Sequence, residues 1–193
     1  VGCGYKYLCG GPGAPAYLYI HPRHQNKQWP SIPGWMGHFD IYAFSGRYEP
    51  NPGIISQSTG SPVIIPNEIF SAAVEIWKKV SVREIDKKHE SLTRLFHQLI
   101  PQECGNLGAE MISPAVHSES GGHVSTSHPG AGPVSEALLE HGVVSSFRKP
   151  DSIRFGISPL YHSHQDIWEG IQRLKKVLSG EIWKEERFQK VSV

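Results

Sequence analysis

Three cysteines, two methionines and no long apolar run are the most informative shortages in this 193-residue sequence. An odd number of cysteines without Cys-x-x-Cys spacing argues against a disulfide framework and fits a reducing compartment. No apolar stretch reaches the roughly 18 residues that a membrane span requires, and the N-terminus lacks the basic and apolar regions of a signal peptide. We therefore expect no membrane association and a cytoplasmic location.

An excess charge of one sign is also missing, because the formal net charge is +1 and the charges of both signs are interspersed, as in residues 87–90. This balance gives no electrostatic reason to expect nucleic acid or an anionic membrane as a partner. The contents of 38% hydrophobic and 19% charged residues are ordinary for a globular protein. The sequence does not begin with methionine, and we expect it to be a fragment of a longer protein.

A glycine-rich stretch at residues 2–13 contains a single lysine, Lys6, which has Tyr5 and Tyr7 beside it and no neighbouring carboxylate. Burial of such a lysine would disfavour its charged form and leave an amine able to attack a carbonyl group. Lys6 is therefore a candidate reactive lysine. The alternative is an ordinary solvated lysine on a glycine-rich surface turn.

Alternation in residues 152–158 predicts a strand with Ile153, Phe155 and Ile157 on one face and Arg154 and Gly156 on the other. A guanidinium beside the open space that a glycine leaves is suited to a bidentate grip on a carboxylate. The alternative is an arginine on the solvent face of an edge strand.

The rest of the chain divides by pattern into a loop-rich first part and a second part with regular elements. We expect strands at 3–8 and 17–20 and a long ordered loop over 25–66. His21 and His24 could suggest a metal, but no third ligand is nearby and we assign none. We expect helices that begin at 67 and at 81, and the second has a Ser81–Glu84 capping box and a stop at Pro101. Two further helices follow, one that ends at 142 and one capped by Ser163 and Asp166. The expected strands are 110–113, 123–127, 143–147 and 152–158.

Four motifs stand out along the chain. They are Tyr5-Lys6-Tyr7-Leu8 with Gly11-Pro12-Gly13, Gly34-Trp35-Met36-Gly37-His38, Gly60-Ser61-Pro62, and residues 153–161 around Arg154. Together, and in this order, they resemble the motifs of the kynureninases, a family of fold-type I enzymes that depend on pyridoxal phosphate (PLP). The four motifs in order are more specific than any one of them.

The resemblance implies an α/β fold equivalent to the C-terminal half of a fold-type I PLP enzyme. Residues 1–80 would form the end of the large-domain sheet with the cofactor lysine, followed by a long interface loop and helices. Residues 81–180 would form a small α+β domain, and 181–193 a peripheral tail.

The resemblance also implies an activity, hydrolytic Cβ–Cγ cleavage of L-kynurenine or 3-hydroxykynurenine to an anthranilate and L-alanine, in tryptophan catabolism and NAD biosynthesis. Lys6 would hold PLP covalently and then act as the base at Cα, and Tyr5 would contact the phosphate and move protons. Trp35 and Ser61 would reach the cofactor across a homodimer interface. Ser61 stands where the family has Thr or Asn, which makes its contact less secure. Arg154 would bind the substrate α-carboxylate.

Three alternatives stay open at this point. The chain could belong to another class V enzyme, such as an aminotransferase or a cysteine desulfurase, although the Trp35 loop argues against it. It could be a non-catalytic dimerisation fragment, and as a fragment it is expected to be inactive alone. The glycine-rich turn could bind a nucleotide phosphate, but it lacks the Gly-Lys-Ser/Thr ending. We assign His38 no role beyond a structural hydrogen bond, and His89 a place in the core.

Overall fold

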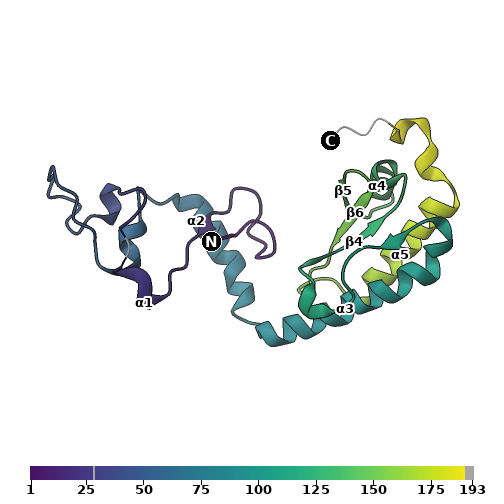
Figure 1. The fold of residues 1–193 in the computed structure, drawn as a ribbon, viewed down its shortest axis with the longest axis horizontal. Coiled ribbons are helices and arrows are strands. Elements are labelled where there is room, and N and C mark those ends of the chain that lie inside the picture. The colour runs from purple at the N-terminus through teal and green to yellow at the C-terminus, as the bar shows by residue number, and fades with distance from the viewer. Residues whose placement is uncertain (28, 190–193) are drawn as a thin grey trace. The chain divides into compact units, whose positions relative to one another are not determined.

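The computed structural model describes residues 1–27 and 29–189, and the chain divides between Lys79 and Val80 into two compact units (Figure 1). Unit 1 has little regular structure. Its strands β1 (Gly2–Cys3) and β2 (Ala16–Tyr17) pair antiparallel, and they are shorter than the strands expected at 3–8 and 17–20. Lys6 consequently lies in the turn after β1, not on a strand.

Short helices interrupt the long segment that follows. They are α1 (Pro22–Gln25), η1 (Trp35–Gly37) and η2 (Gly53–Gln57). The longest helix of unit 1, α2 (Ile64–Trp77), begins before Asn67, so Asn67 is not its N-cap. Pro66 fits within the first turn of α2 because backbone N–H groups there have no partner in the helix.

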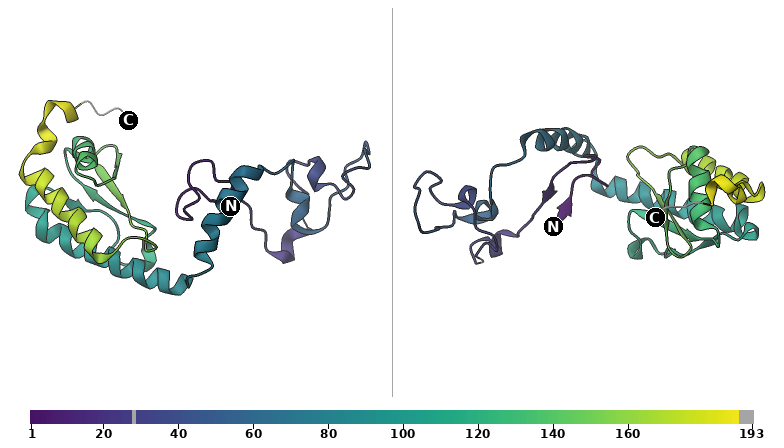
Figure 2. Two further views of the ribbon diagram at one scale, coloured as in Figure 1. Left: turned by 180° about the vertical axis from the view of Figure 1, so that it is seen from behind. Right: turned by 90° about the horizontal axis from the view of Figure 1, so that it is seen from above.

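Unit 2 is a two-layer arrangement of helices on one face of an antiparallel sheet with the strand order β3-β4-β6-β5. The strands are β3 (Glu110–Met111), β4 (His123–Ser127), β5 (Ser146–Arg148) and β6 (Ser152–Gly156). The helices are α3 (Val82–Glu103), α4 (Ala131–Glu140) and α5 (His164–Ser179). Helices α3 and α5 run side by side (Figures 1 and 2). Short helices η3 (Gly105–Leu107) and η4 (His117–Glu119) lie in the connections.

One core joins the two layers of unit 2. Val124 of β4 pairs with Phe155 of β6, and both side chains are buried against the helices. The Phe96 ring of α3 lies 5.1 Å from that of Phe155, measured between centroids. The alternation predicted for residues 152–158 is thus observed, because the apolar side chains of β6 face the helices and Arg154 lies on the opposite face.

The ends of the helices show where local sequence signals hold. Ser163 and Asp166 form the predicted capping box at the start of α5. Ser81 is the N-cap of α3, but its side chain makes no capping hydrogen bond. Pro101 does not end α3, which continues to Glu103, because the buried Leu99 and Ile100 hold its last turn in the core.

The expected peripheral tail needs correction over its described part. The short helices η5 (Ile182–Lys184) and η6 (Glu186–Phe188) follow α5, and Phe188 is buried in the core. The Trp183 ring lies 5.2 Å from that of His128 and covers Gly130, where a Cβ atom would collide with the indole. The tail therefore packs on unit 2 through its aromatic residues. The many charged residues of the tail led us to expect a peripheral position instead. Residues 190–193 lie outside the described residues.

Buried histidines should make unit 2 sensitive to acid. Burial lowers the pKa of His89, and nearby His117 lowers it further, against the opposing effect of Asp86. Burial likewise lowers the pKa of His128, although a hydrogen bond with the backbone of Leu107 opposes the shift. Since the folded-state pKa lies below the ordinary value of 6.5, each histidine stabilises the fold fully above about pH 6.5, and this stabilisation is lost as the pH falls through the folded-state pKa.

We expect the urea midpoint of unfolding to fall between about pH 7.5 and about pH 5.5, with a slope of up to about 1.4 kcal/mol per pH unit for each such histidine. His128→Asn should make this decline shallower, because asparagine does not bind a proton in this pH range. The variant should still fold, since its amide oxygen can accept the Gly130 N–H bond that Nδ1 now accepts. His123→Asn, at an exposed histidine, is the matched control. A midpoint that does not change with pH would contradict the assignment.

Candidate active site

The turn that contains Lys6 is shaped by its glycines. Backbone bonds join Gly10 N–H to the Gly4 carbonyl and Cys9 N–H to the Lys6 carbonyl, each at 2.9 Å. Gly11 and Gly13 have φ angles of 72° and 87°, in the left-handed region that glycine adopts without strain. The turn therefore presents Lys6 on a tightly folded, glycine-lined loop.

Helix α2 packs against this turn. A Cβ atom at Gly4 would lie 2.6 Å from the Phe70 ring, so only glycine permits this close approach. Trp77 Nε1 donates a hydrogen bond of 3.3 Å to the Leu8 carbonyl. The sequence predicted a strand over residues 3–8 leading into a glycine-rich turn, and it gave no sign that α2 packs against the residues around Lys6.

Lys6 and Tyr5 are adjacent in space as well as in sequence. Lys6 Nζ lies 5.0 Å from the centre of the Tyr5 ring, in cation–π geometry. Both side chains are exposed, Tyr5 by 46%. The burial assumed for a reactive lysine is therefore not provided by the described residues of this chain.

Trp35 and the Gly60–Ser61 turn, expected to act together, do lie together. Gly34 packs directly against the Thr59 backbone, which leaves no space for a side chain. The Nε1 atom of Trp35 lies 4.0 Å from the position that a Cβ atom would take at Gly60. The indole is 52% exposed and Ser61, the residue after Gly60, is exposed too, so both side chains are open to solvent.

These two groups do not form one site within the chain. The glycine-rich loop beside the N-terminus and the segment with η1 and η2 lie at opposite ends of unit 1, on either side of α2 (Figures 1 and 2). Each group carries polar side chains that could contact a phosphorylated cofactor, and neither surrounds one.

Arg154 lies on an internal strand, which corrects the edge-strand alternative. Its cross-strand neighbours are Ser125 of β4 and Ser146 of β5, on the same face of the sheet. Arg154 Nη2 donates a hydrogen bond of 3.4 Å to Ser146 Oγ, and the guanidinium is partly buried. A Cβ atom at Gly156 would touch nothing within 4 Å, so open space does lie beside the arginine.

The two serines were missed in the sequence. Their partnership with Arg154 depends on which strands are neighbours, and strand order is not encoded in local alternation. His38 was given only a possible structural role, and the structure shows hydrogen bonds at both of its ring nitrogens. Among the described residues there is no group of three or more His, Cys, Asp or Glu side chains placed to hold a metal ion. No helix in that part of the chain is both long and apolar enough to span a membrane.

Solved structures identify the class of fold. An apo cysteine desulfurase from Thermococcus onnurineus superposes with a TM-score of 0.69 at 16% identity, over 88% of this chain and 45% of that one. The cystine C-S lyase C-DES superposes with a TM-score of 0.64 at 17% identity, over 84% of this chain and 43% of that one. Identities this low concern the fold alone, and the fold is that of part of a fold-type I enzyme.

Sequence similarity points to a particular family within this class. Residues 85–174 match the family model described as the kynureninase C-terminal domain. The kynureninase of Deinococcus radiodurans is 38% identical over 178 residues, which cover 92% of this chain and 43% of the relative. That of Burkholderia mallei is 32% identical over 188 residues, which cover 97% of this chain and 45% of the relative.

The resemblance to the C-terminal half of kynureninases is thereby confirmed. The chain spans less than half the length of these relatives. Cysteine desulfurases resemble this chain in fold only, whereas kynureninases also resemble it in sequence, at 32–38% identity. The alternative of another class V enzyme is therefore not favoured.

Proposed function

We propose that this chain is the C-terminal part of a PLP-dependent kynureninase, which hydrolyses the Cβ–Cγ bond of L-kynurenine or 3-hydroxykynurenine to release an anthranilate and L-alanine. The observation that carries the proposal is similarity to kynureninases at 32–38% identity along 92–97% of the chain. The reaction would belong to tryptophan catabolism and contribute to NAD biosynthesis. A cytoplasmic location is part of the proposal, supported by three free cysteines.

The residues present fit PLP. The cofactor needs an amine to hold its aldehyde carbon and neutral or cationic donors for its phosphate. Lys6 offers the amine on a loop where Gly11 and Gly13 leave open space, since a Cβ atom at either would touch nothing within 4 Å. Trp35 Nε1 and the Ser61 hydroxyl supply donors at the second surface.

Each residue has a distinct task in the proposed reaction. When bound, PLP supplies an electron sink for the bonds broken in the substrate. The Lys6 amine would hold the cofactor, and as a free amine it would accept the proton from the substrate Cα. The Tyr5 hydroxyl, beside Lys6, moves a proton as water adds to the side-chain carbonyl. The Arg154 guanidinium binds and orients the α-carboxylate.

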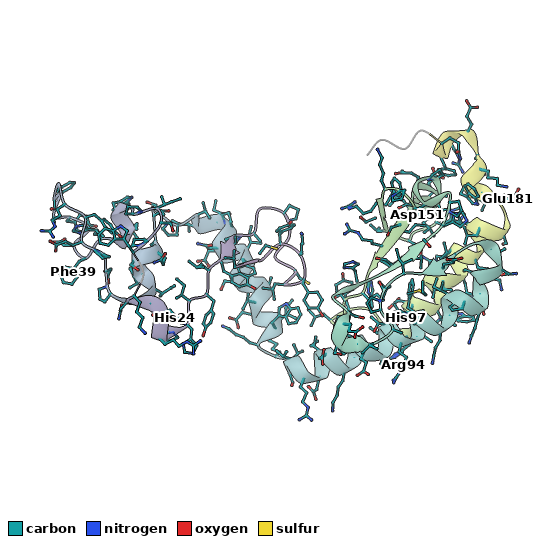
Figure 3. All side chains as sticks on the ribbon, viewed as in Figure 1. His24, Phe39, Arg94, His97, Asp151 and Glu181 are labelled. Atoms are coloured by element: carbon teal, nitrogen blue, oxygen red, sulfur yellow. The ribbon has the colours of Figure 1, made fainter. Side chains whose placement is uncertain are left out.

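A homodimer with shared active sites is part of this proposal. Two observations support it. The Lys6 loop and the Trp35 segment lie at opposite ends of unit 1, so a second copy could bring them together. Unit 1 also leaves large apolar side chains exposed, and α2 has no buried residue. Figure 3 shows Phe39, which is 67% exposed, at the outer edge of the loop after η1.

Anthranilate release is the test of the reaction. A protein of the relatives' full length that contains this chain should, with PLP, release fluorescent anthranilate from L-kynurenine. Binding of PLP without release of anthranilate from L-kynurenine, and without release of the hydroxylated anthranilate from 3-hydroxykynurenine, would overturn the proposed reaction and leave the cofactor assignment standing.

Hybrid dimers test the shared site. In a dimer of one Lys6→Ala subunit and one Trp35→Phe subunit, one site keeps Lys6 from one copy and Trp35 from the other. We expect this hybrid to recover about half the wild-type activity, although each homodimer is impaired. If Trp35 serves the lysine of its own subunit, every site of the hybrid carries a lesion and mixing restores nothing.

A further inference from the structure

The imidazole of His38 makes hydrogen bonds at both ring nitrogens. The backbone N–H of Asp40 donates to Nδ1 at 3.0 Å, and Nε2 lies 3.2 Å from the Arg47 carbonyl oxygen. A carbonyl oxygen only accepts, so Nε2 must carry the proton and Nδ1 must not. The two bonds together require the neutral Nε2–H tautomer.

These bonds close the base of an exposed loop over residues 39–47. Its two ends are joined by Phe39 N–H to the Glu49 carbonyl and by Asn51 N–H to the Gly37 carbonyl, both at 2.8 Å. Phe44 at the far end is 93% exposed with a φ of 48°. The His38 bonds and these two backbone bonds therefore all lie at the base of the loop, far from Phe44.

Tyr48 extends the same network to the segment that precedes Ser61. Its ring lies 5.6 Å from that of His38, edge to face, and its hydroxyl donates a hydrogen bond of 3.4 Å to the Ser56 carbonyl in η2. Gly37 is enclosed between these groups, since a Cβ atom there would lie 2.7 Å from both Ser56 O and Tyr48 Oη. The C-terminal end of η1 therefore packs closely against η2.

Trp35 lies at the start of η1, three residues before His38. A cavity of about 390 Å³ is lined by both side chains and by Tyr48. Within residues 1–27 and 29–189 the indole N–H of Trp35 makes no hydrogen bond, so its place beside Gly60 depends on the backbone of η1. The backbone of η1 is held at its C-terminal end by the His38 and Tyr48 network.

We infer that His38 is a positioning residue, whose neutral Nε2–H imidazole fixes the Trp35 indole N–H beside the Gly60–Ser61 turn for the phosphate of the cofactor. The inference rests on the proposed function. It assigns His38 no contact with cofactor or substrate, and its effect is exerted through Trp35.

The experiment measures the dissociation constant of PLP by absorbance titration of the full-length apo enzyme. His38→Ala removes both hydrogen bonds and should weaken PLP binding about tenfold, while kcat at saturating PLP changes less than about threefold. His38→Gln can still donate an amide N–H toward the Arg47 carbonyl and should recover part of the affinity. His24→Ala, at an exposed histidine of the same unit, is the matched control and should bind PLP as the wild type does.

A double-variant cycle separates positioning from general stability. Trp35→Phe alone should weaken PLP binding about tenfold, and adding His38→Ala should cause little further loss, because the two residues act through one contact. His38→Asn, which keeps an acceptor for the Asp40 N–H, replaces His38→Ala in the cycle if the alanine variant fails to fold.

The outcomes distinguish the positioning role of His38 from the cofactor role of Trp35 on which it rests. Weaker binding in Trp35→Phe with unchanged binding in His38→Ala overturns the inference alone, as do fully additive losses in the double variant. Unchanged binding in Trp35→Phe overturns both the inference and the cofactor role proposed for Trp35.

Discussion

Lys6→Ala in the full-length enzyme should abolish the visible absorbance of lysine-bound PLP and lower kcat/KM for L-kynurenine at least about 10³-fold, because both covalent attachment and the base at Cα are lost. The effect should be this large since the turn contains no second lysine: the residues that follow Lys6 up to Gly13 carry no other amine. Absorbance of the purified protein with added PLP and steady-state anthranilate release measure the two losses.

Lys27→Ala is the control for this variant. Lys27 is an exposed lysine of the same unit, and its removal should change neither the absorbance nor the rate. Retention of the lysine-bound absorbance in Lys6→Ala would show that another lysine holds the cofactor, and the assignment of the glycine-rich turn would then be wrong.

Arg154→Lys should raise KM for L-kynurenine and lower kcat/KM about 10²-fold, with PLP affinity unchanged. Lysine keeps the positive charge but has no planar fork for a bidentate carboxylate contact. It also cannot reproduce the guanidinium geometry that Ser146 now orients from the neighbouring strand. Steady-state kinetics at saturating PLP, together with a PLP titration, separate substrate binding from cofactor binding.

Arg148→Lys is the matched control for the same exchange. Arg148 lies on β5 of the same sheet, and its Nη1 atom donates to the Phe147 carbonyl. Its replacement should leave kcat/KM within about twofold of the wild type. Equal losses in the two variants, or a loss of PLP affinity in Arg154→Lys, would contradict the carboxylate assignment.

Regular elements of unit 2 were largely predictable from the sequence because local signals and packing agree there. The capping box of α5 and the alternation of β6 each combine a local preference with a buried face. Where the two signals disagree, packing decides. Pro101 is a strong local stop, yet α3 continues to Glu103 because Leu99 and Ile100 are buried.

Spatial relations within the candidate site were less predictable. The motifs around Lys6, Trp35 and Arg154 could be found by resemblance, but their neighbours depend on contacts far apart in the sequence. Arg154 lies between two strands whose order no local pattern specifies. The bond from Trp77 to the Lys6 turn joins residues 69 positions apart. Whether Lys6 is exposed depends on which segments pack over the turn, and the sequence of the turn alone does not determine this.

Covalent trapping of the cofactor tests directly whether Lys6 is the lysine that holds PLP. The full-length protein is incubated with PLP, reduced with borohydride so that the cofactor becomes permanently attached to the lysine that holds it, digested, and mapped by mass spectrometry. We expect the pyridoxyl mass on Lys6 and a loss of this label when L-kynurenine is added before reduction. A label on another lysine, or no label at all, would contradict this assignment.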